Sequence, residues 1–123
     1  MTKNTNKLYD LEERTLEFGK RIVRMCKVLP KETVNYELIK QCLRSGTSIG
    51  ANYIEANDAL SKKDFVFRLR IARKEAKETV YWLNLITENN ENTEERIRPL
   101  LQEASELKKI LSSIIDKSGI KLK

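Results

Sequence analysis

Six of the basic side chains in the stretch from Lys62 to Lys77 form one group. At about 100° per residue they fall in one sector of a helix. Ammonium and guanidinium groups arranged in this way contact phosphate oxygens without reading bases, so the pattern predicts sequence-independent binding of RNA or DNA. A solvated charged face is the alternative interpretation. The six residues are Lys62, Lys63, Arg70, Arg73, Lys74 and Lys77.

A second polar group precedes this stretch and recurs at three- and four-residue intervals beside an apolar stripe. Gly46 and Gly50 make the same segment unusually small, which predicts a closely packed neighbouring helix. Polar side chains at the edge of a core usually hydrogen-bond to the next helix, so we expect a network that fixes helix register. A ligand-binding role is the alternative. The group comprises Arg44, Ser45, Ser48, Asn52 and Glu55.

The 123-residue chain has no histidine. Ser-His-Asp and Cys-His nucleophile systems and histidine-containing zinc sites are therefore excluded. The carboxylates of Glu55, Glu75 and Glu78 are the remaining candidates for metal ligation, but surface salt bridges are the expected use of such residues. We expect a protein that is not an enzyme and that holds no cofactor and no metal.

The elements that must position these groups are helical. Four Gly and two Pro residues punctuate long stretches rich in Leu, Ile, Glu, Lys and Arg. Apolar residues recur at helical spacing in four segments, with no strand-like alternation between them. We predict a single domain over residues 1–123, an all-α, antiparallel up-down-up-down four-helix bundle. The expected helices cover about residues 8–29, 34–58, 62–88 and 98–117, followed by a loose tail from residue 120.

Helix ends follow from capping residues. The second helix is predicted to start with Thr33 or Asn35 as its N-cap. Ser61, followed by Asp64 three positions later, resembles a capping box for the third helix. Pro99 is predicted to be the first residue of the last helix, where its missing N–H costs nothing. The alternative is a helix capped by Thr93, in which Pro99 lies in the second turn and produces a kink.

The third helix carries two apolar stripes about 140° to 160° apart on the helical wheel. One is the expected core stripe. The other would leave large apolar side chains exposed on a monomer, so it predicts an interface between copies of the chain. The alternative is that this helix is central in its own bundle and buried on two sides. The second stripe comprises Phe67, Ile71, Tyr81, Trp82 and Leu85.

Cellular location follows from what the sequence contains and lacks. Cys26 and Cys42 lie on apolar helical stripes, as expected of buried free thiols, and two cysteines are too few for a disulfide scaffold. No apolar run approaches the ~18 residues of a membrane span, and the first residues lack the apolar core of a signal peptide. We expect a cytoplasmic protein with no membrane partner.

The run from Gln41 to Ala56 has the spacing Arg-Ser-x-x-Ser-Ile-x-x-Asn-x-x-Glu. It resembles the four-helix-bundle family encoded in intervening sequences of large-subunit ribosomal RNA genes, whose relatives include the accessory variability proteins of diversity-generating retroelements. The resemblance continues through Phe65, Leu69 and Glu78 and covers nearly the whole chain. It implies a homopentamer and, in the retroelement branch, a basic surface that engages nucleic acid and a reverse transcriptase.

The formal net charge of +6 and the pI of about 9.4 are compatible with a polyanionic partner. The expected function is therefore that of a non-catalytic oligomeric protein that binds RNA or DNA as an accessory factor. The competing hypothesis is a protein–protein interaction scaffold whose basic residues only keep it in solution.

Overall fold

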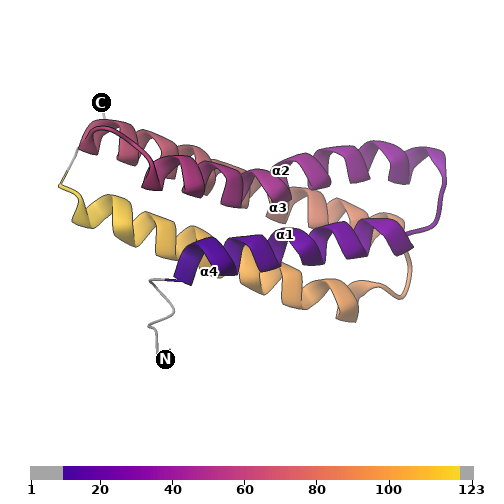
Figure 1. Ribbon diagram of the computed structural model, residues 1–123. Coiled ribbons are helices and arrows are strands. Elements are labelled where there is room, and N and C mark those ends of the chain that lie inside the picture. The colour runs from indigo at the N-terminus through magenta and orange to yellow at the C-terminus, as the bar shows by residue number, and fades with distance from the viewer. Residues whose placement is uncertain (1–9, 120–123) are drawn as a thin grey trace, which may run out of the picture.

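The computed structural model describes residues 10–119, which form four α-helices joined by short turns (Figure 1). They are α1 (Leu11–Val28), α2 (Thr33–Asn57), α3 (Lys62–Asn89) and α4 (Glu94–Lys117). Successive helices run in opposite directions, so the predicted all-α up-down-up-down arrangement is confirmed (Figure 1). The expected helix start at residue 8 and the expected tail from residue 120 lie outside the described residues.

The core is built from the apolar stripes of all four helices. Helical spacing brings these side chains to one face of each helix, and the four faces meet along the bundle axis. Burying a side chain of this size stabilises the fold by roughly 1.5–3 kcal/mol. Fully buried members are Leu11, Phe18, Ile22, Cys42, Ile49, Leu69, Leu83, Leu107 and Leu111.

α2 and α3 each pack extensively against two neighbours, α2 against α1 and α3, and α3 against α2 and α4, whereas α1 and α4 have little contact with each other. The smaller contact between α1 and α4 is fastened by Arg14. Its Nε donates to Glu103 Oε2 (2.7 Å), and its Nη2 donates to Glu103 Oε1 (3.0 Å) and to Glu106 Oε1 (2.8 Å). The hydrogen bond to Glu103 is the main cause of a raised pKa for Arg14.

α2 is capped by a residue that the sequence did not indicate. Glu32 Oε1 accepts hydrogen bonds from the backbone N–H groups of Val34 (2.6 Å) and Asn35 (3.3 Å). The predicted caps Thr33 and Asn35 are wrong, because Thr33 is already helical and the Asn35 side chain is buried. A hydrogen bond from Asn89 Nδ2, followed by that from Val34, lowers the pKa of Glu32.

The Asn35 side chain ties the start of α2 to the end of α3. Its Nδ2 donates to Pro30 O (2.9 Å) and to Asn90 Oδ1 (2.8 Å). Its Oδ1 accepts from Asn89 Nδ2 (2.9 Å) and Asn90 Nδ2 (2.8 Å). Because both donors and the acceptor are satisfied, this buried amide fixes the level at which the two helices meet.

At the start of α3, Ser61 Oγ accepts a hydrogen bond from Asp64 N (3.0 Å), which confirms Ser61 as the N-cap. At α4 the preferred start near residue 98 was wrong and the alternative start is correct, because the helix begins at Glu94 with Thr93 as its N-cap and includes Pro99 in its interior. Asn92 adopts a positive φ of 67°, and Ile97 N donates to Thr93 O (3.0 Å), so the first turn closes before the proline. Only the Glu95 carbonyl loses its usual donor, and Glu95 is exposed to water.

α1 and α2 approach each other closely at two glycines. A Cβ atom at Gly50 would lie 2.9 Å from Thr15 Oγ1 and 3.1 Å from Thr15 Cβ, and one at Gly46 would lie 3.0 Å from Ile22 Cγ1. Only hydrogen fits in these gaps. The predicted close packing at the small residues of α2 is therefore confirmed.

We expect Gly50→Ala to destabilise the protein by about 1 kcal/mol, because overpacking against Thr15 outweighs the helix propensity that alanine gains. Gly19→Ala is the matched control, since its nearest neighbouring atom is Thr47 Cγ2 at 4.0 Å. This variant should gain up to ~1 kcal/mol. Urea unfolding measures both changes, and an equal gain for the two variants would contradict the close approach.

Candidate functional site

The six predicted basic residues all lie on α3, but they differ in exposure. Lys62, Lys63, Lys74 and Lys77 are exposed, whereas Arg70 and Arg73 are half-buried. Arg73 Nη1 donates to Ser112 Oγ of α4 (3.2 Å), so this guanidinium is partly used to hold α3 against α4. The lysines are the charges that α3 presents most fully to solvent.

The exposed lysines form two pairs along α3. Lys62 and Lys63 lie at the start of the helix, and Lys74 and Lys77 lie roughly 17 Å further along it at 1.5 Å per residue. Lys74 and Lys77 border an open hollow of about 440 Å³ that Glu78, Tyr81 and Trp82 also line. The positive surface is thus a row along one helix.

α4 extends this positive surface in a way that sequence reasoning missed. Lys108 and Lys109 lie one helical turn before Ser112, the residue that Arg73 contacts. Lys109 is exposed and Lys108 is half-buried. No signal in the sequence indicated which face of α4 would adjoin the basic sector of α3.

The second apolar stripe of α3 lies on the outer surface of the bundle. Phe67 and Tyr81 are 55% and 59% exposed, while Ile71, Trp82 and Leu85 are half-buried. The Tyr81 and Trp82 rings meet edge to face with centroids 5.0 Å apart. Both earlier interpretations therefore apply in part, since the bundle covers about half of the stripe and still leaves two aromatic side chains in solvent.

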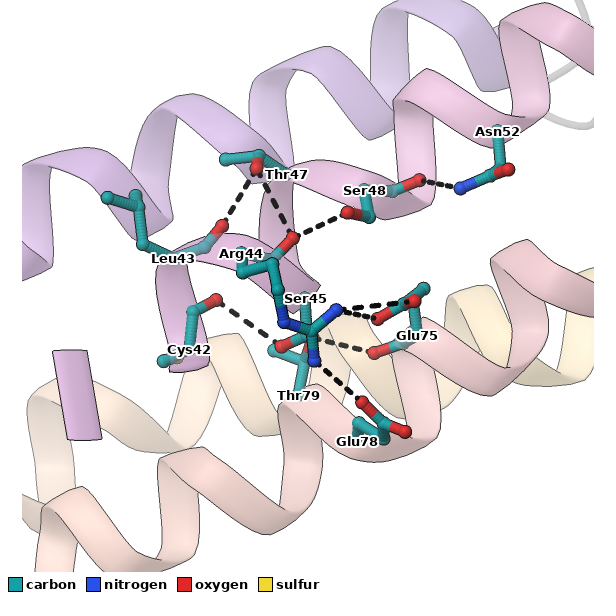
Figure 2. Close-up of polar contacts among 10 residues, drawn as sticks. All are labelled: Cys42, Leu43, Arg44, Ser45, Thr47, Ser48, Asn52, Glu75, Glu78 and Thr79. Atoms are coloured by element: carbon teal, nitrogen blue, oxygen red, sulfur yellow. Dashed lines mark hydrogen bonds and ion pairs between the residues drawn. The ribbon is translucent and has the colours of Figure 1, made fainter. Parts of the chain in front are cut away.

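The polar group on α2 contributes an ion pair across the seam with α3. Arg44 Nη1 donates to Glu75 Oε1 (3.2 Å) and Arg44 Nη2 donates to Glu78 Oε1 (2.9 Å), as Figure 2 shows. The Glu75 side chain is only 9% exposed, and that of Arg44 is 50% exposed. The hydrogen bond with Glu78 is the main cause of a raised pKa for Arg44. Glu75 and Glu78 thus form ion pairs that join α3 to α2.

Beside this ion pair, the hydroxyl groups of Ser45 and Thr79 lie 2.8 Å apart in the core (Figure 2). Thr79 Oγ1 also donates to the Glu75 carbonyl of its own helix (2.8 Å). Both hydroxyls are fully buried. Arg44 and Ser45 are therefore the members of the predicted network that hold α2 and α3 in register.

The other three members of the predicted network contribute little to this seam. Ser48 Oγ donates to the Arg44 carbonyl (2.6 Å) and Asn52 Nδ2 donates to the Ser48 carbonyl (3.0 Å), so both bond along their own helix (Figure 2). Asn52 Oδ1 has one long contact across the seam, 3.5 Å from Arg68 Nη1. Glu55 is exposed, and its carboxylate has no hydrogen-bond or ion-pair partner among residues 10–119.

Neither cysteine is arranged as a nucleophile. Burial raises the pKa of Cys26 to about 11 and, together with the nearby Cys26, raises the pKa of Cys42 to about 12. At neutral pH both side chains are therefore thiols, and the thiolate is the reactive form. They act as small apolar groups in the bundle.

Between Asp10 and Gly119, no three Cys, Asp or Glu side chains are grouped so that they could hold a metal ion. None of the four described helices combines the length and the apolar character that crossing a membrane requires.

The comparisons with known proteins agree with this architecture. Residues 8–113 match the model of the 23S rRNA-intervening sequence protein family. The chain belongs to this family. No match was found among curated proteins.

This family member is also similar to a crystal structure from Bacteroides thetaiotaomicron VPI-5482, described as a protein of unknown function from the S23 ribosomal protein family. The two chains are 43% identical, and the match covers 90% of this chain and 99% of the other with a TM-score of 0.82. Neither description names a catalytic activity.

We expect Arg44→Met to destabilise the family member by about 1–2 kcal/mol, because the poorly exposed Glu75 carboxylate loses its cationic partner. Arg24→Met is the matched control. Its partner Glu17 is 56% exposed, and Arg24 itself is 62% exposed, so the loss should stay below about 0.5 kcal/mol. Denaturant unfolding at neutral pH measures both, and equal losses would contradict a structural role for the seam.

Proposed function

We propose that this protein is a non-catalytic bundle that assembles with copies of itself and binds RNA or DNA independently of sequence along α3. One observation carries the proposal: α3 presents an exposed row of lysines beside an outward apolar stripe. The row comprises Lys62, Lys63, Lys74 and Lys77, and the stripe comprises Phe67, Ile71, Tyr81, Trp82 and Leu85.

The charge pattern favours phosphates over bases. A lysine ammonium contacts a phosphate as a point charge and carries no sequence information. Four lysines on one copy neutralise only a few phosphates, which gives weak, salt-sensitive binding. The proposed function therefore depends on repetition of the row.

Self-assembly supplies that repetition. The outward stripe on α3 leaves Phe67 and Tyr81 more than half exposed, and exposed aromatic side chains of this size favour contact with a partner. Each added copy would bring its own lysine row to the same polyanion. Linked sites raise the overall affinity without any new type of contact.

The competing candidate is a protein–protein scaffold that does not bind nucleic acid. This candidate is favoured because two of the basic side chains are not fully available to a ligand. Arg73 already donates to Ser112, and Arg70 is half-buried. In that case the lysines only keep the assembly in solution. The salt dependence of nucleic-acid binding separates the two functions.

The test uses Lys74→Gln/Lys77→Gln against Lys27→Gln/Lys31→Gln, which removes the same number of exposed charges near the α1–α2 turn. Fluorescence anisotropy with labelled RNA and DNA of unrelated sequences is recorded over a salt series. We expect the first variant to bind more weakly to every sequence and to lose about 1 unit of salt slope per phosphate contact removed. The control should bind as the wild type does.

Light scattering on the same samples verifies that both variants keep the wild-type mass, so that lost binding is not lost assembly. Undetectable binding by the wild type, or identical salt slopes for the two variants, would contradict nucleic-acid binding and favour the scaffold.

A further inference from the structure

A hollow of about 380 Å³ lies between the second half of α1 and the first turns of α4, which meet at the same end of the bundle (Figure 1). α1 and α4 have little contact with each other, so the boundary between them is not closed along its whole length. Buried side chains form the floor of the hollow, and exposed ones form its rim. The apolar lining residues are Met25, Val28, Leu29, Ile97, Pro99 and Leu100.

Three arginines line the same hollow, Arg21 and Arg24 from α1 and Arg96 from α4. Within residues 10–119, none of the lining residues carries a carboxylate. Arg24 Nη2 already donates to Glu17 Oε2 on the exposed surface of α1 (3.1 Å). The guanidinium groups of Arg21 and Arg96 have no hydrogen-bond or ion-pair partner in the described part of the chain. Two positive charges are thus uncommitted beside an apolar floor.

The neighbouring level of the α1–α4 boundary shows what these two arginines lack. Arg14 of α1 donates to Glu103 of α4 (2.7 Å). Arg21 lies seven positions after Arg14, and Arg96 lies seven positions before Glu103, which is two helical turns in each case. Because the two helices are antiparallel, the register that gives Arg14 a carboxylate gives Arg21 a second cation. An anion bound between these two guanidinium groups would replace repulsion with attraction.

The other polar groups nearby do not supply that anion. Glu94 and Glu95 occupy the first turn of α4, but neither lines the hollow, and Glu94 lies 3.5 Å from Arg98. Thr93 lines the hollow and is buried, and its hydroxyl already donates to the Asn90 carbonyl (2.6 Å). An anionic headgroup would therefore bind at the arginines on the rim rather than on the floor.

The lining restricts the chemistry of the occupant. Guanidinium groups pair with carboxylates through planar sets of N–H donors, and two uncommitted guanidinium groups match the two oxygens of one carboxylate. The apolar floor favours a ligand with hydrocarbon to bury. Its volume of about 380 Å³ is at the small end of the range of ligand sites, roughly 300–1,000 Å³, which suits a chain of moderate length.

We propose that this hollow binds a medium-chain carboxylate. The headgroup would lie between Arg21 and Arg96, and the chain would pack against Leu29, Ile97 and Leu100. This site lies on α1 and α4, and it does not depend on the function proposed for α3.

Met25 provides a direct probe, because it lines the hollow and the chain has only one other methionine, Met1. A ¹³C-methyl methionine NMR spectrum therefore contains two signals, which Met25→Leu assigns. Titration with sodium decanoate below its critical micelle concentration should shift the Met25 signal until it saturates. At the same concentrations, acetate, which lacks the chain, and decyltrimethylammonium, which reverses the charge, should leave the signal in place.

Arg21→Gln/Arg96→Gln should weaken decanoate binding about tenfold, because both headgroup contacts are lost. Lys20→Gln/Lys109→Gln is the matched control, since it removes one exposed charge from each of the same two helices outside the lining. The control should bind as the wild type does. Val28→Glu is a second variant that places a carboxylate on the rim at a position that is 65% exposed, and it should also weaken binding. Circular dichroism verifies that each variant remains helical.

A Met25 signal that decanoate leaves unmoved, or equal decanoate binding by the two glutamine variants, would overturn the site. An equal response to decyltrimethylammonium would show that the arginines play no part, and would overturn it as well. Tighter binding of decyl phosphate than of decanoate would overturn the assignment to a carboxylate. A shift caused by an oligonucleotide but not by decanoate would overturn the proposal and assign the arginines to nucleic-acid phosphates.

Discussion

α3 buries apolar side chains along the side that faces α2 and α4, and it carries further large apolar side chains along its outer side. The first set closes the core of one copy. The second set stays partly in water, where apolar surface is unfavourable unless something covers it. The partly exposed side chains of α3 are therefore the reason to propose assembly. Assembly in turn would repeat the lysine row once for each copy.

The seam between α2 and α3 fixes the position of that helix. Arg44 spans Glu75 and Glu78, and the buried hydroxyls of Ser45 and Thr79 lie beside them. Polar contacts in an apolar core penalise any sliding of one helix along the other, since a shifted register would leave buried groups unpaired. The seam thereby fixes the position of the outer stripe of α3 along the bundle axis, relative to α2.

The close approach of α1 and α2 has two consequences. Gly46 and Gly50 let Ile22 and Thr15 reach the backbone of α2, which tightens the pair. The same small residues leave a shallow hollow on the outer side, flanked by Leu16 and Ile54. The small residues that allow close packing therefore also shape the outer surface of α1 and α2.

Much of the fold was predictable because it depends on local patterns. Helical spacing located the four core stripes, and Ser61 with Asp64 marked the start of α3. The start of α4 was missed because the turn at Asn92 and Thr93, rather than Pro99, decides where the helix begins.

The candidate site was less predictable because it depends on which faces meet. Spacing on α2 alone could not show that Arg44 would reach Glu75 and Glu78. The apolar hollow between α1 and α2, lined by Leu16, Val23 and Ile54, was missed because glycine, alanine and threonine interrupt its apolar pattern, and the pattern is complete only when the two helices lie side by side.

The mass of the wild-type protein in solution tests the central claim most directly. Sedimentation equilibrium over a range of micromolar concentrations would measure it. Coverage of the outer side of α3 by another copy predicts a discrete species at a multiple of 14.4 kDa. A single species at 14.4 kDa throughout that range would contradict the account.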